Sequence, residues 1–170
     1  SRNTLAYDPT NDTWGAGGLT ELAPHRSCMA TAVVGDTWYL FGGLGDDHLT
    51  APQGQAGPRP TADASAWKPG FDQSYRALPP MPTPRAGAVA VTVGSKVFVI
   101  GGVTRQGALT GAVEAYDAAT DRWELRAPLQ RPRAYAAAGL VAGAIVVAGG
   151  VLGLEPGTDV PIADVEAVVP

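Results

Sequence analysis

The clearest pattern in the chain is a pair of short apolar runs joined by a tight turn, and it occurs three times. The best copy spans residues 84–102, where apolar residues dominate 89–93 and 97–100. Between these runs lies Val93-Gly94-Ser95-Lys96, a turn in which glycine adopts positive φ at little cost. A glycine pair closes each copy, at Gly42-Gly43, Gly101-Gly102 and Gly149-Gly150. The pattern predicts three β-hairpins of similar construction.

An arginine stands sixteen positions before each glycine pair, at Arg26, Arg85 and Arg133. The offset within a copy is constant, whereas the copies themselves are 59 and 48 residues apart. Insertions therefore lie between the hairpins and leave each hairpin intact, which is typical of a repeat protein.

A second signature pairs a tyrosine with a tryptophan seven residues later, as in Tyr7 with Trp14 and Tyr116 with Trp123. The residues between them are rich in Asp, Asn, Thr and Pro, whose side chains favour turns. A weaker copy exchanges the aromatics, Trp67 coming before Tyr75, and residues 165–168 begin a last copy.

The chain resembles the kelch repeat, which has an arginine, a glycine pair, a tyrosine and a tryptophan in this order. The resemblance extends over residues 5 to 169. The resemblance implies an all-β propeller of four-stranded antiparallel blades. It predicts one propeller segment of about three blades, divided into 1–25 (partial), 26–84 (with a long loop at 44–63), 85–132 and 133–170 (partial). We expect this segment to belong to a larger six- or seven-bladed ring; ring closure by two or more copies is the alternative.

Composition supports short strands and many turns, because 45% of the 170 residues are hydrophobic, 16% are charged, 22 are glycine and 15 are proline. Strands are expected at residues 26–34, 37–41, 64–67, 73–78, 133–139 and 144–148, among others. The net charge of −4, with no basic run, gives no support to a nucleic-acid or anionic membrane partner. Cys28 is the single cysteine, so no internal disulfide forms and the compartment stays open.

The resemblance also implies where a ligand would bind. In kelch blades the residue after the proline lies near the mouth of the central channel. Arg26, Arg85 and Arg133 are therefore candidate ligand-binding residues, as are Cys28 and Tyr135, each two residues after an arginine. The arginines could hold carboxylates, or they could pair with Glu114 or Glu166 and fix blade packing. Repetition in every blade favours packing, since ligand sites usually break symmetry.

No catalytic group, metal site or cofactor is predicted. Asp46-Asp47-His48 reads as a solvated loop. Glu155 and Asp159 resemble part of the iron motif of kelch-type specifier proteins, but Ala163 stands where that motif has histidine. The favoured function is a binding module for a protein or glycan, with specificity in the loop at 44–63. The alternatives are a kelch-type sugar enzyme similar to sialic acid mutarotase and, less well supported, a fragment similar to copper radical oxidases.

Overall fold

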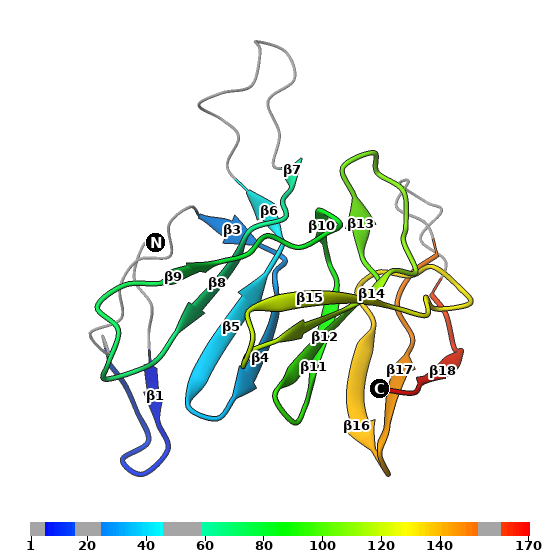
Figure 1. Cartoon of the computed structure of the whole chain (residues 1–170). Helices are drawn as coiled ribbons and strands as arrows, with labels where there is room; N and C mark the ends of the chain where they lie inside the picture. The colour runs from blue at the N-terminus through cyan, green and yellow to red at the C-terminus, as the bar shows by residue number, and fades with distance from the viewer. Residues whose placement is uncertain (1–5, 16–24, 46–58, 153–160) are drawn as a thin grey trace.

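The computed structural model describes residues 6–15, 25–45, 59–152 and 161–170 (Figure 1). The predicted all-β fold is confirmed, because these residues form only strands, turns and loops. No helix in this part of the chain could cross a membrane.

Three antiparallel sheets make up most of the structure. The first contains β4 (Ala30–Val34), β5 (Thr37–Phe41), β8 (Ala64–Trp67) and β9 (Arg76–Leu78), paired in that order. The second contains β11 (Val89–Val93), β12 (Lys96–Ile100), β14 (Val113–Asp117) and β15 (Arg122–Arg126). The third contains β16 (Ala137–Val141), β17 (Ala144–Ala148) and β18 (Val165–Val168). A separate hairpin joins β1 (Ala6–Asp8) to β2 (Thr13–Gly15).

The three sheets stand side by side, with β11 lying against both β4 and β16 (Figure 1). Their alternating side chains form two apolar layers between neighbouring sheets. One layer includes Tyr39, Phe41, Val97, Val99 and Tyr116, and the other includes Phe98, Ile100, Ile145, Val147 and Val168. Burying a large apolar side chain stabilises a fold by about 1.5–3 kcal/mol, so these layers hold the sheets together. Sheets stacked in this manner are the blades of a β-propeller; the larger ring stays a prediction.

The Tyr/Trp signature forms the turn between β14 and β15 in the second sheet and the turn between β1 and β2 in the separate hairpin. The hydroxyl of Tyr116 donates a hydrogen bond to Asp121 Oδ1, and the hydroxyl of Tyr7 donates one to Asp12 Oδ1 at 2.7 Å. Both aspartates adopt positive φ, 56° and 53°, a conformation that short polar side chains tolerate better than most. The repeated turn chemistry expected from the sequence is therefore present in both copies.

The predicted continuous strands at 26–34 and 133–139 are wrong. Cys28 and Tyr135 adopt φ of 53° and 54°, which no β-strand accommodates, so the regular inner strands begin only at Ala30 and Ala137. Ahead of the break at Cys28, β3 (Arg26–Ser27) pairs with β6 (Leu44–Gly45), and ahead of the break at Tyr135, Ala134 pairs with Val151. In the second sheet, β10 (Arg85–Ala86), which precedes Gly87, pairs in the same way with β13 (Val103–Thr104).

These short strands, together with β7 (Arg59–Pro60), lie at the end of the sheets opposite the hairpin turns (Figure 1). We call this end, comprising β3, β6, β7, β10 and β13, the loop end. Residues 44, 45, 59 and 60, at the borders of the predicted loop at 44–63, thus form strands, because their backbone groups pair with β3 and with one another. Residues 46–58 of that loop lie outside the described residues.

Candidate binding site at the loop end

The side chain of each repeated arginine reaches carbonyl oxygens of its own sheet. Arg26 Nη1 donates to the carbonyl of Gly42 at 2.9 Å, and Arg133 Nη1 donates to the equivalent carbonyl of Gly149 at 3.2 Å. Arg85 Nη2 donates to the carbonyl of Val99 at 3.0 Å. A planar guanidinium with five N–H donors suits such a socket, because it can satisfy several carbonyl groups at once.

Arg85 also forms a buried ion pair with Glu114 of β14. The Arg85 Nη1 to Glu114 Oε2 distance is 2.6 Å, and the two side chains are 0% and 1% exposed. Burial lowers the pKa of Arg85, while the charge and hydrogen bond of Glu114 raise it. The guanidinium of Arg85 is thus enclosed and neutralised within its own blade, as the packing interpretation expects.

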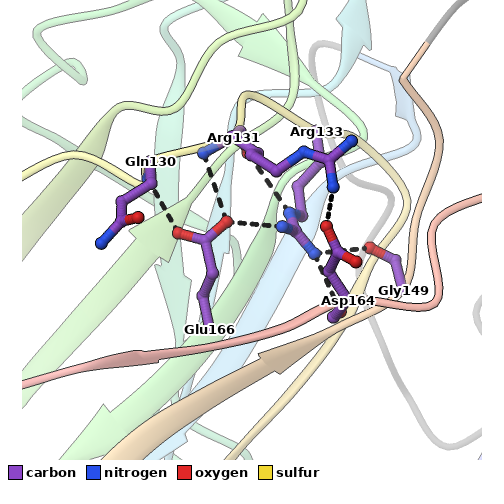
Figure 2. A network of polar contacts seen from close by, with 6 residues as sticks. All are labelled: Gln130, Arg131, Arg133, Gly149, Asp164 and Glu166. Carbon is purple, nitrogen blue, oxygen red and sulfur yellow. Dashed lines mark hydrogen bonds and ion pairs between the residues drawn. The ribbon is translucent and has the colours of Figure 1, made fainter.

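Arg133 occupies the corresponding place in the third sheet and belongs to a wider network (Figure 2). Its Nη2 lies 2.5 Å from Glu166 Oε1, and its Nη1 donates to the carbonyl of Asp164 at 3.1 Å. Glu166 also accepts the backbone N–H of Gln130 at 2.8 Å and that of Arg131 at 3.2 Å. Arg131 forms a further ion pair with the Asp164 carboxylate. The network connects β18 with the segment that leads out of the second sheet.

Arg26 is less enclosed than the other two arginines. Besides Gly42, its Nη1 donates to the carbonyl of Asp63 at 2.6 Å, and its Nη2 donates to Ser65 Oγ at 2.8 Å. Burial lowers the pKa of Arg26, and the carboxylate of Asp63 opposes this shift from a longer distance. Within the described ranges Arg26 forms no ion pair.

The residues two positions after the arginines form a row across the three sheets. Gly87 donates its backbone N–H to the carbonyl of Cys28 at 3.0 Å, and Tyr135 donates to the carbonyl of Gly87 at 2.8 Å. All three residues have positive φ. The ring of Tyr135 covers Gly87, where an added Cβ would lie 2.8 Å from Tyr135 Cε1. The structure therefore brings Cys28 and Tyr135 together, with Gly87 between them.

Two of these side chains face solvent. Cys28 is exposed and Tyr135 is 53% exposed, in contrast to the buried Arg85 and Arg133. Partial burial, together with the neighbouring Cys28 thiol, raises the pKa of Tyr135, so its phenol is a hydrogen-bond donor at neutral pH. Gly87 was missed as a member of this row, although its spacing from Arg85 was the available signal. An exposed aromatic ring beside a thiol and a hydroxyl can contact both apolar and polar groups of a ligand.

Neighbouring loops are also tied at this end. Arg105, after β13, donates its Nε N–H to the carbonyl of Pro60 in β7 at 2.8 Å. No group of three His, Cys, Asp or Glu side chains that could hold a metal occurs in the part of the chain that the structure describes. Asp46-Asp47-His48 and the segment from Glu155 to Asp159 lie outside that part. The ligand-binding role of Arg26, Cys28, Arg85, Arg133 and Tyr135 stays a prediction.

Comparison with known proteins identifies the repeat. The Kelch motif family matches residues 84–130, which span the second sheet. The chain is 30% identical over 102 residues to Kelch repeat protein M-T8 of Myxoma virus, covering 60% of this chain and 17% of the relative. It is 27% identical over 195 residues to Kelch-like protein terF of Aspergillus terreus, covering 86% of this chain and 42% of the relative.

Kelch-like protein 35 of Mus musculus is 29% identical over 94 residues, which cover 53% of this chain and 16% of that protein. The chain thus spans less than half the length of each of these curated relatives. Motif, sheet architecture and relatives agree that residues 84–130 form a kelch motif and that the chain is similar to kelch-repeat proteins.

Proposed function

We propose that this chain is a segment of a kelch propeller that binds a protein partner at its loop end. Similarity to kelch-repeat proteins suggests a protein-interaction module. The observation that carries the location is the exposed row of Cys28 and Tyr135 beside the loop strands, since it combines a half-exposed aromatic ring with hydrogen-bonding groups. Aromatic side chains with a polar tip are enriched at protein interfaces for this reason.

The five predicted site residues divide into two groups in this proposal. Cys28 and Tyr135 contact the partner directly, because their side chains reach solvent. Arg85 and Arg133 set the positions of the loops, because their guanidinium groups are buried against Glu114 and Glu166. Arg26 is the arginine of the three that remains partly exposed.

We further propose that the blades run through 26–84, 85–132 and 133–170, with 1–25 contributing to a preceding blade, and that the loop at 44–63 carries specificity. The three main sheets support this division, since each lies within one of the three ranges. A six- or seven-bladed ring would then place the loop ends of all blades around one channel mouth.

A peptide selection tests the location of the binding surface. Peptides from a random phage-displayed library would be selected on the immobilised protein and then measured against Tyr135→Ala, with Ser95→Ala at a hairpin turn as the matched control. We expect at least a tenfold loss of affinity for Tyr135→Ala, and unchanged affinity for the control. Loss of affinity in Ser95→Ala alone would place the binding surface at the opposite end.

The same protein tests the competing functions. Incubation with a panel of sugar acids and glycans, followed by thermal shift and product analysis, should give no response if the partner is a protein. Selective glycan binding that depends on Tyr135 would show that the partner is a carbohydrate and not a protein. Turnover of a sugar acid would show that the function is catalysis.

A further inference from the structure

The Nη1 and Nη2 atoms of Arg26 and Arg133 contact acceptors from equivalent positions of the repeat. In the third sheet, Arg133 Nη1 donates to the carbonyl groups of Gly149 and Asp164, and Nη2 contacts Glu166. In the first sheet, Arg26 Nη1 donates to the carbonyl groups of Gly42 and Asp63, and Nη2 contacts Ser65. The acceptors come from the same positions of the repeat, and one of them differs in charge.

That difference lies at a single repeat position. Glu114 is the second residue of β14 and Glu166 the second residue of β18, whereas the second residue of β8 is Ser65. A serine hydroxyl accepts a hydrogen bond but carries no negative charge. In the described residues, Arg26 is therefore the repeated arginine whose socket lacks a carboxylate.

The guanidinium of Arg26 has donors left over. Three hydrogen bonds engage it, whereas an arginine carries five N–H groups. Its Nε is buried and has no acceptor in the described structure. Arg85 Nε shares this last feature, so the property that distinguishes Arg26 is the absence of a carboxylate in direct contact with its guanidinium; the Asp63 carboxylate acts on it without forming an ion pair.

A cavity of about 310 Å³ lies beside Ser65. Its lining is formed by Asp63, Ala64, Ser65, Tyr75, Ala77, Leu78 and Pro80. Arg26 is not part of this lining, and it reaches the cavity only through its hydrogen bond to Ser65 Oγ at 2.8 Å. Ser65 and Ala77 are partners across β8 and β9, so two small side chains leave space on this face of the sheet. Arg85 and Arg133 each bind the carboxylate of a glutamate, Glu114 and Glu166. We therefore take a carboxylate as the anion that fits beside Arg26.

We propose that Arg26 and Ser65 form a carboxylate-binding site, in which an acidic group from a ligand takes the place that Glu114 and Glu166 take in the other sheets. The charge-assisted hydrogen bond would run from Arg26 Nη2 to the ligand oxygen, with the Ser65 hydroxyl as a second donor. One part of the inference rests on the proposed binding function: the protein partner supplies the carboxylate, as an Asp or Glu side chain.

Acetate is the probe for the site itself. The protein would be titrated with sodium acetate at constant ionic strength, with the ¹⁵N-resolved Arg26 Nε–H resonance and the melting temperature as readouts. We expect a saturable shift of this resonance in the natural sequence and in the control Ser95→Ala, which lies at the hairpin turn between β11 and β12. In Ser65→Glu the built-in carboxylate should raise the melting temperature and weaken acetate binding at least tenfold.

Several outcomes would overturn the inference. These are an absent acetate response in the natural sequence, an undiminished response in Ser65→Glu, or an equal response to phosphate. The selected peptides provide the second arm, in which replacing their Asp and Glu by Asn and Gln should weaken binding to the natural sequence but not to Ser65→Glu. Peptides that need Tyr135 but ignore both changes would overturn the carboxylate site and leave the proposed function standing.

Discussion

Replacing Arg85 by methionine should unfold the protein at a markedly lower temperature. The substitution keeps a long side chain but leaves Glu114, which is 1% exposed, as a buried charge without its partner at 2.6 Å. Breaking a buried ion pair from one side typically costs about 3–5 kcal/mol. For a chain of this length, each kcal/mol lowers the melting temperature by roughly 2–4 °C, so we expect a fall of about 6–20 °C.

The assay is urea unfolding followed by tryptophan fluorescence, combined with calorimetry, on Arg85→Met, Glu114→Met and the double variant. The double variant should lose less stability than Arg85→Met, because it contains no orphaned charge. Lys96→Met is the control: it breaks the half-exposed pair of Lys96 with Glu124 and should cost at most about 1 kcal/mol. A loss of less than about 1 kcal/mol in Arg85→Met, or strictly additive losses in the double variant, would refute the assigned packing role.

Two further predictions concern the turns. Gly102→Ala should destabilise the protein more than Gly94→Ala in urea unfolding, because an added Cβ at Gly102 would lie 2.7 Å from the Ala86 carbonyl oxygen, whereas Gly94 faces open space. At Gly94 the left-handed backbone alone should cost roughly 1–2 kcal/mol. Equal losses of stability in the two variants would contradict the close approach at Gly102. Burial and the Asp121 hydrogen bond raise the pKa of Tyr116, so the unfolded state releases this proton first and stability should fall as the pH rises above about 10. Tyr116→Phe should flatten this alkaline loss in urea titrations from pH 8 to 11, and an unchanged slope would show that Tyr116 does not cause it.

The hairpins were predictable because their signals are local. The turn at Gly94 and the apolar runs around it determine the pairing of β11 with β12, and the structure has the pair Val93 with Lys96 at that turn. The buried partners of two arginines were also among the predicted alternatives, since Glu114 and Glu166 recur at one repeat position. Residue identity and spacing suffice for such features.

The breaks in the inner strands could not be predicted in the same way. Cysteine and tyrosine have no intrinsic preference for positive φ, and Cys28 and Tyr135 adopt it where their backbones form hydrogen bonds with Gly87 of the neighbouring sheet. The two-residue strands at the loop end are too short to show a periodicity. The uncharged Ser65 in the place of Glu114 and Glu166 follows from the contacts of the three arginines in space and not from spacing along the chain.

In the row of Cys28, Gly87 and Tyr135, the contacts that hold neighbouring sheets together are separate from the side chains that face solvent. Its hydrogen bonds between sheets use main-chain atoms alone, and the two side chains that it presents, a thiol at Cys28 and a phenol at Tyr135, are chemically unlike. Substitutions at Cys28 and Tyr135 can therefore diversify the chemistry presented to solvent while the main-chain hydrogen bonds between sheets are preserved. The scaffold thus permits new recognition properties to evolve at one row without redesign of its interior.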